Sequence, residues 1–259
     1  MIQELFKNNE LELFIQFSKR EFLARYKQSF IGIGWAVIQP LVLMVIFTIV
    51  FGKFAKIPSD GIPYPIFSYT ALLPWTLLAS GINYGVNSLT SNVSLITKVY
   101  FPREVIPLAS ILVATIDFFV ASTIFVGLIL WYNITFSFNF LMIIPLVILQ
   151  LIVIVTIVLV LSVWNVRYRD VRHGLPFVIQ VWMYASPVVY PLSVVPEEWE
   201  PFYVMNPMVG IIDGYRALIL RGEALDIITL FPALIFAFVG LPFAYIYFKK
   251  AEKSFADII

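Results

Sequence analysis

The segment Trp164–Gly174, WNVRYRDVRHG, gathers three arginines, one aspartate and the only histidine of the chain between two long apolar runs. Arginine presents a planar fork of N–H donors that pairs well with phosphate oxygens. Arg167, Arg169 and Arg172 could therefore meet anionic headgroups, or they could serve only to orient the chain in a membrane. His173 is expected to be a loop residue beside this basic cluster, because a single histidine makes no metal site.

Motifs for other chemistries are missing. The sequence has no GxxxxGK[ST] phosphate loop, so the chain should not hydrolyse ATP by that route. It has no HExxH, GxSxG or paired His/Cys spacing, and no cysteine, which excludes disulfides and thiolate metal sites. We therefore expect no catalytic residue, no metal and no cofactor in this chain.

Asp117 lies in a long apolar stretch, ATIDFFVAST. A carboxylate inside a membrane is costly and is by default a functional candidate, either as a proton relay or as a cation ligand. The alternative is a structural role, in which the carboxylate pairs with a basic or hydroxyl partner during helix packing. The structural role is favoured, because no second acidic residue falls in a predicted span.

The composition requires lipid as a solvent. Hydrophobic residues make up 61% of the chain and charged residues 13%, against about 45–50% and ~25% in soluble domains. The net charge of +1 gives no indication of nucleic acid. The N-terminus, MIQELFKNNELELF, lacks the basic-then-apolar order of a signal peptide, so the first residues are expected to be kept.

Runs of about 20 apolar residues are long enough to cross the hydrocarbon core as helices, the form that satisfies backbone polar groups there. Six are predicted: Gly34–Phe54, Ile66–Leu89, Val105–Trp131, Phe140–Trp164, Leu175–Tyr190 and Ile227–Phe248. The fold class is thus an all-α integral membrane protein with six transmembrane helices.

Basic residues predict the orientation. Of the 17 Lys and Arg residues, thirteen would lie on one side of the membrane, and the four on the other side are Lys53, Lys56, Arg216 and Arg221. Because cytoplasmic loops carry the excess of Lys and Arg, both termini should be cytoplasmic.

The chain is predicted to form one domain, 1–259, with two segments that do not cross the membrane. Residues 1–31 are amphipathic and should form a helix along the cytoplasmic interface. Residues 191–226 form the outer connection, in which Asn206-Pro207 is a good helix start. A short helix, Met208–Leu220, would either re-enter the outer leaflet or merely cap the extracellular end. The spans occupy 34–190 and 227–248.

Aromatic residues gather near the ends of spans one and five, at Tyr26, Phe30, Trp35, Phe177, Trp182, Tyr184 and Tyr190. Tyr and Trp belts at membrane interfaces are one explanation. The other is a wide passage lined with rings, past which a sugar polymer slides on many weak contacts. Pro40 and Pro187 fall inside these two spans, where kinks would open room between helices.

Four segments together resemble the membrane subunit of type-2 ABC exporters. They are RYKQSFIGIGWAVIQP (Arg25–Pro40), SNVSLITKVYFPREVIP (Ser91–Pro107), RYRDVRHGLPFVIQVWMYASPVVYP (Arg167–Pro191) and NPMVGIIDGYR (Asn206–Arg216). Their order and their predicted sides of the membrane match that family along nearly the whole chain. The likeness is greatest to permeases that export lipid-linked O-antigen, and teichoic-acid exporters look similar.

The resemblance implies a homodimer in the bacterial inner membrane, bound to two copies of a separate cytoplasmic ATPase that holds ATP and Mg. The cargo would be a polysaccharide on polyprenyl diphosphate. Exporters of teichoic acid, other polyol phosphates, lipids or drugs are the nearest alternatives. A secondary transporter or a membrane glycan ligase is more remote, because no internal repeat is found and no large loop carries acidic groups beyond Glu197, Glu198 and Glu200.

The resemblance also implies roles for particular residues. Contact with the ATPase would fall to Ser94, Leu95, Lys98, Val99, Tyr100, Phe101 and Arg103. The cargo diphosphate would meet Arg25, Lys27, Arg167, Arg169 and Arg172. An outer gate would contain Glu197, Glu198, Trp199, Tyr203 and Tyr215.

Overall fold

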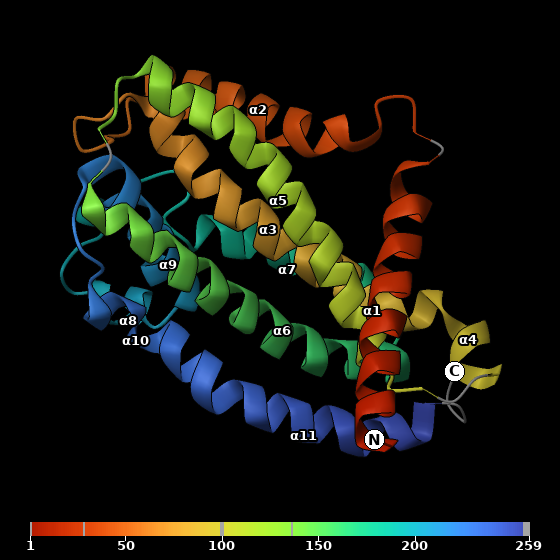
Figure 1. Cartoon of the computed structure of the whole chain (residues 1–259). Coiled ribbons are helices and arrows are strands. Elements are labelled where there is room, and N and C mark those ends of the chain that lie inside the picture. Colours follow the sequence, from red (N-terminus) through yellow and green to blue (C-terminus); the bar gives the residue numbers. More distant parts are fainter. Residues whose placement is uncertain (1, 28, 99–100, 136, 256–259) are drawn as a thin grey trace.

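The computed structural model describes residues 2–27, 29–98, 101–135 and 137–255, with side chains from residue 11 onward. Helices account for most of these residues, and the described part contains no strand, as predicted. The long helices run roughly side by side, while α1 (Ile2–Tyr26) lies across one end of the bundle (Figure 1).

Five helical segments are long and apolar enough to cross a membrane: Gly32–Phe54, Tyr64–Ser91, Val105–Trp131, Phe138–Arg167 and Ile227–Ser254. The first joins η1 (Gly32–Gly34), α2 (Trp35–Phe47) and the π-helix η2 (Thr48–Phe54). The next two are α3 (Tyr64–Ser91) and α5 (Val105–Trp131). The fourth joins η3 (Phe138–Met142) to α6 (Ile143–Arg167). The last contains α10 (Ile227–Ile235), η6 (Phe236–Gly240), α11 (Leu241–Ala251) and η7 (Glu252–Ser254).

The predicted fifth span, Leu175–Tyr190, differs from the helix that forms there. Helix α7 (Asp170–Tyr184) starts five residues earlier and ends six residues sooner. Its 15 residues reach only about 22 Å, short of the ~30 Å hydrocarbon core. Pro187 follows the helix instead of kinking it, since the residue before a proline is disfavoured in helical conformation, whereas Pro40 does lie inside α2.

The outer connection contains η4 (Leu192–Val194), α8 (Glu200–Val204), α9 (Pro207–Arg216) and the π-turn η5 (Ala217–Arg221). The predicted start of α9 is confirmed, because the Asn206 side chain accepts a hydrogen bond from the Met208 N–H at 3.0 Å. Helix α8 has no counterpart among the predicted helices. Helix α9 is buried along most of its length and packs on α3, α6 and α10.

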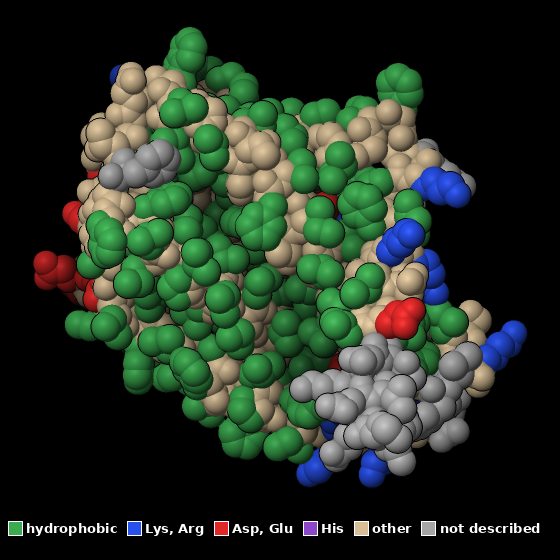
Figure 2. Space-filling model, in the orientation of Figure 1, with side chains coloured by type: hydrophobic (Ala, Val, Ile, Leu, Met, Phe, Trp, Pro, Cys, Tyr) green, Lys and Arg blue, Asp and Glu red, His purple; other side chains and the backbone are tan. Residues whose placement is uncertain are grey.

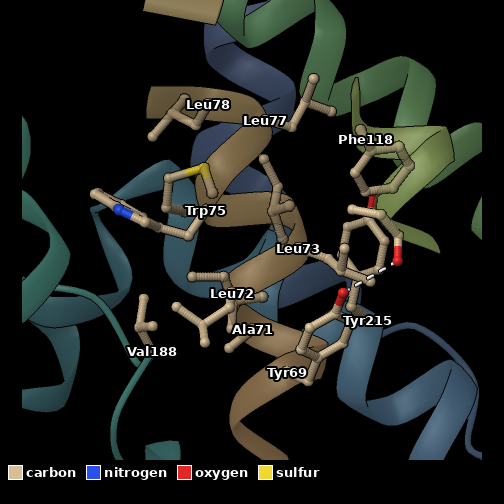
Figure 3. Packing of buried hydrophobic residues seen from close by; sticks show 14 of the residues in the cluster. Tyr69, Ala71, Leu72, Leu73, Trp75, Leu77, Leu78, Phe118, Val188 and Tyr215 are labelled. Atoms are coloured by element: carbon tan, nitrogen blue, oxygen red, sulfur yellow. Dashed lines mark hydrogen bonds between the residues drawn. The ribbon is translucent and has the colours of Figure 1, made fainter. Parts of the chain in front are cut away.

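Helix α3 forms the centre of the bundle. It packs against α2, α5, α6, α7 and α9, and most of its side chains are buried. In Figure 3, Phe118 of α5 and Tyr215 of α9 lie on one side of α3, and Trp75 points to the opposite side. Because protein and not lipid surrounds α3, its modest hydropathy is tolerated.

Glycines let α3 approach α6 closely. A Cβ on Gly81 would meet Ile154 Cγ2 at 2.9 Å, and one on Gly85 would meet Val158 Cγ1 at 2.6 Å. Small residues at such crossings are typical of membrane helix packing. Gln150 of α6 donates to the Pro74 carbonyl at 2.6 Å, so the pair is also joined by a buried hydrogen bond.

At one end of the bundle, a second hydrophobic cluster forms around Phe101, Phe248 and Phe255. Phe17 of α1 packs on Phe101 with ring centroids 5.3 Å apart. Lys and Arg side chains gather at this end, and hydrophobic side chains cover the belt next to it (Figure 2). The distribution agrees with the charge asymmetry of the sequence.

At the opposite end, Arg216 holds the chain that follows α7. Its side chain is 1% exposed. It donates to the carbonyls of Val188 at 3.1 Å and Tyr190 at 3.2 Å, and its guanidinium lies 3.7 Å from the Phe67 ring centroid. A charge predicted to face the outer solvent is therefore buried, where it ties the outer connection to α3 and α9.

Candidate functional site

The arginine cluster lies where α6 ends and α7 begins. Arg167, Arg169 and Arg172 are exposed, and none makes a hydrogen bond or an ion pair with the described part of the chain. Each of the other five arginines has a partner: Arg20, Arg25, Arg103, Arg216 and Arg221. The three cations of this cluster are thus the arginines left open to an external anion.

A cavity of about 260 Å³ opens beside this cluster, lined by Thr90, Val93, Asn165, Val166, Arg169, Arg172 and His173. We call it the basic cavity. Asn165, a buried residue of its lining, donates to the Val86 carbonyl at 3.0 Å and to Thr90 Oγ1 at 3.2 Å. Arg169 is the N-cap residue of α7, and His173 lies in the first turn of that helix and not in a loop as predicted. The two residues are four positions apart, so they reach the same cavity.

Arg25 and Asp117 form an ion pair at 2.9 Å between α1 and α5. The Tyr26 hydroxyl donates to the other Asp117 oxygen at 2.6 Å. Burial, and then the hydrogen bond to Asp117, raises the pKa of Tyr26 above its ordinary value, so this hydroxyl stays a donor. The Arg25 guanidinium also lies 3.5 Å from the Tyr84 ring centroid. Arg25 therefore already has an acidic partner, unlike the three arginines of the cluster. Lys27, two residues later, is exposed.

A second cavity, of about 320 Å³, adjoins this ion pair and lies between α1, α2, α3, α5 and α7. We call it the ring cavity. Trp35, Trp75 and Tyr84 bring their rings to it, and Gln39 brings an amide. Arg25 Nη2 is buried and has no hydrogen-bond partner in the described part of the protein.

Helices α2 and α7 each present an exposed face that carries an amide. Gln39 on α2 and Gln180 on α7 are exposed and make no hydrogen bond among the described residues. Unpaired amides are costly against lipid. These faces are therefore suited to water, a polar cargo or another protein surface.

The predicted channel rings fall into two groups. Phe30, Trp35, Phe177 and Tyr184 are exposed. Tyr26, Trp182 and Tyr190 have partners inside the chain. Trp182 donates to the Asn206 side chain at 2.9 Å and lies edge-on to Trp75, and Tyr190 donates to the Tyr184 carbonyl at 3.0 Å.

The predicted ATPase contact lies around α4 (Val93–Lys98). Ser94 and Lys98 are exposed and Leu95 is partly buried, while Val99 and Tyr100 fall outside the described residues. Phe101 does not point outward: it is 9% exposed and packs on Phe17, because the chain turns back into the bundle there. Arg103 donates to the Glu252 carbonyl, so it contacts the C-terminal segment.

The predicted outer-gate residues also divide. Glu197, Glu198 and Trp199 are exposed, and Tyr203 donates to the Tyr190 hydroxyl at 3.2 Å. Tyr215 is not at the surface: it is 2% exposed and its hydroxyl donates to Gln150 at 3.0 Å. It belongs to the core, because α9 faces inward.

Two further observations limit the candidate sites. A cavity of about 380 Å³ between α3, α5 and α6 has an almost wholly apolar lining, so it offers little beyond contact with hydrocarbon. In the part of the chain that the structure describes, no three His, Cys, Asp or Glu residues come together as metal ligands would.

The helices and the comparison with known families define the class. Several apolar helices long enough to cross a membrane make this an integral membrane protein. The family described as ABC-2 type transporter matches residues 12–220, and the chain belongs to that family. The resemblance found in the four sequence segments is thereby confirmed.

Curated relatives match the chain along most of its length. It is 26% identical over 262 residues to the O-antigen export system permease protein RfbA of Myxococcus xanthus, covering 100% of this chain and 99% of that protein. The RfbA protein of Klebsiella pneumoniae is 28% identical over 253 residues, covering 96% and 95%. The polysialic acid transport protein KpsM of Escherichia coli is 25% identical over 234 residues, covering 86% and 88%.

Proposed function

We propose that this chain is the membrane subunit of an ATP-driven exporter that carries a lipid-linked polysaccharide across the bacterial inner membrane. The names of its relatives support this proposal, because O-antigen and polysialic acid are both polysaccharides. The observation in the structure that supports it best is the pair of exposed helix faces that carry the unpaired amides Gln39 and Gln180.

The chain supplies half of the conduit, and a second copy supplies the other half. The exposed faces of α2 and α7 are mainly apolar and aromatic, and each carries one unpaired amide that lipid would solvate poorly. Two such faces meeting across a two-fold axis enclose the passage and keep these amides away from lipid. The exposed rings of Phe30, Trp35, Phe177 and Tyr184 then offer sliding contacts to sugar faces. Two-fold symmetry is the commonest arrangement of homo-oligomers.

We assign six crossings to the chain in the membrane. Helix α7 and the segment up to Tyr190 form the fifth, which is short because the outer connection dips inward to meet it. The re-entrant part is α8 and α9, and both termini are cytoplasmic. The gathering of Lys and Arg at the end where α1 and α4 lie supports this orientation.

The cargo diphosphate binds at the basic cavity. Arg169, Arg172 and His173 surround it, and the two arginines have no acidic partner in the described chain. Arg167 and the exposed Lys27 add positive charge near the same membrane face. Arg25 does not take part directly, because Asp117 already neutralises it.

A separate cytoplasmic ATPase drives transport through α4 and α1. Ser94 and Lys98 form the exposed part of the contact, and Phe101 passes the movement inward by packing on Phe17. Val99 and Tyr100 complete the contact. At the other end, the exposed residues Glu197, Glu198 and Trp199 act as the outer gate, with Tyr203 bonded to Tyr190 behind them.

The experiment has two parts. The tagged chain, purified from its own cells in mild detergent, should retain an ABC-type ATPase, and deleting its gene should leave the glycan inside the cell. An Arg169→Gln, Arg172→Gln double variant should insert normally but export at least ~10-fold less glycan, while Lys53→Gln on the outer side exports normally. A chain that purifies without an ATPase, or a double variant with full export, would refute the corresponding part of the proposal.

A further inference from the structure

The ring cavity combines three features that no lipid contact explains. Its walls come from five helices and include the only ion pair that joins α1 to α5 among the described residues. Gln39, beside it, is an exposed amide in the middle of an apolar span. Arg25 Nη2 is shielded from solvent and has no hydrogen-bond partner among the residues that the structure describes.

The charge of the ring cavity distinguishes it from the basic cavity. Asp117 pairs with Arg25 and accepts from Tyr26, so the charged groups at the ring cavity balance. At the basic cavity Arg169 and Arg172 have no such partner. A phosphate therefore favours the basic cavity, while the ring cavity favours a neutral ligand with both donors and acceptors, such as a polyol.

The shape of the ring cavity narrows the ligand further. Its volume of about 320 Å³ is at the lower end of the ~300–1,000 Å³ usual for small-molecule sites, which suits one ring and not a chain of rings. Trp35 is 44% exposed and offers a flat aromatic face. The C–H groups of a pyranose carry slight positive charge and pack on the negative face of such a ring.

We propose that the ring cavity is a saccharide subsite that binds one sugar ring of the glycan, with Trp35 stacking on the ring and Gln39 hydrogen-bonding its hydroxyls, while Arg25 forms part of the cavity wall. This proposal rests on the proposed function, since the glycan is the exporter's cargo. Asp117 and Tyr26 act as positioning residues that hold Arg25, and with it the end of α1, at the wall of the ring cavity. The basic cavity then binds the diphosphate of the lipid-linked glycan, and the ring cavity binds a sugar near that diphosphate.

The test uses the absence of cysteine from the sequence. Single substitutions place one thiol at each location: Ala36→Cys in the ring cavity, Thr90→Cys in the basic cavity, Phe177→Cys on the exposed face of α7 and Thr97→Cys on α4. The full complex is labelled with a small maleimide in membranes from cells that make the lipid-linked glycan, and from cells blocked before the first sugar is added.

The proposal predicts that the glycan slows labelling of Ala36→Cys at least ~5-fold, and that adding Gln39→Leu or Trp35→Leu removes this protection. Thr97→Cys should label equally in both membranes. Adding inorganic diphosphate to the blocked membranes should protect Thr90→Cys but not Ala36→Cys. Protection that survives both second substitutions would also overturn the assigned contacts.

Two negative results have different meanings. If Thr90→Cys and Phe177→Cys are protected by the glycan while Ala36→Cys is not, the saccharide subsite is refuted and the exporter function stands. If none of the three is protected and no glycan is exported, the proposed function itself fails. Protection of Ala36→Cys by inorganic diphosphate would instead make the ring cavity an anion site and overturn the proposal.

Discussion

Asp117 shows what a single residue in an apolar helix can and cannot reveal. Its cost inside a membrane is evident from the sequence, because a lone carboxylate in a span needs a partner. The sequence does not identify that partner, because Arg25 lies 92 residues away and belongs to another helix. Tyr215, assigned to an outer gate from the resemblance, lies in the core, where its hydroxyl donates to Gln150.

The ion pair between Arg25 and Asp117 should contribute strongly to stability. Asp117→Asn leaves the Arg25 charge largely buried and unpaired. The side chains keep 14% and 16% exposure, so the loss should be about 2–3 kcal/mol, below the ~3–5 kcal/mol typical of fully buried pairs. Thermal unfolding of the purified chain in detergent measures it.

A double-mutant cycle provides the control for this prediction. Arg25→Met combined with Asp117→Leu removes both charges, so the double variant should lose clearly less stability than the sum of the two single variants. Strict additivity would mean that the two charges do not interact as the structure places them.

At the scale of elements, the sequence predicts helices well where one long apolar run forms one helix. The predicted end of the fifth span is wrong, because the apolar run continues past Tyr184 whereas the helix ends there. Ser186 precedes Pro187, a position that disfavours helix, and Arg216 donates to the carbonyls of Val188 and Tyr190. The same limit applies to α4. Its exposure follows from sequence, but the burial of Phe101 depends on Phe17 of a distant helix.

Helix α9 and helix α10 should tolerate no side chain at their closest approach. A Cβ on Gly210 would lie 2.1 Å from the Thr229 carbonyl oxygen, whereas one on Gly127 in α5 meets nothing within 4 Å. Gly210→Ala should therefore lower the yield of folded protein severely, and Gly127→Ala should be neutral or slightly stabilising. Size-exclusion profiles of both variants test this, and equal profiles would contradict the packing.

Helix α4 should transmit the ATPase movement through its exposed face. Lys98→Glu reverses a charge on that face and should reduce glycan export at least ~5-fold without changing the amount of chain in the membrane. Lys53→Glu, on the opposite side, is the matched control. Full export by the Lys98 variant would remove this residue from the coupling contact.

For the whole molecule, charge distribution predicts orientation more firmly than it predicts any single role. The basic end that contains α1 and α4 should face the cytoplasm. Because the sequence has no cysteine, Thr97→Cys and Ser193→Cys can report each side with an impermeant maleimide. Intact cells should label only Ser193→Cys, and labelling of Thr97→Cys from outside would invert the orientation.

In the proposed exporter, this chain provides the path across the membrane and a separate ATPase provides the energy. The direct measurement is transfer of lipid-linked glycan across proteoliposomes that contain the chain alone, or the chain with its ATPase, each with and without ATP. We predict transfer only with both proteins and ATP. Sustained transfer by the chain alone, or by the complex without ATP, would contradict the account.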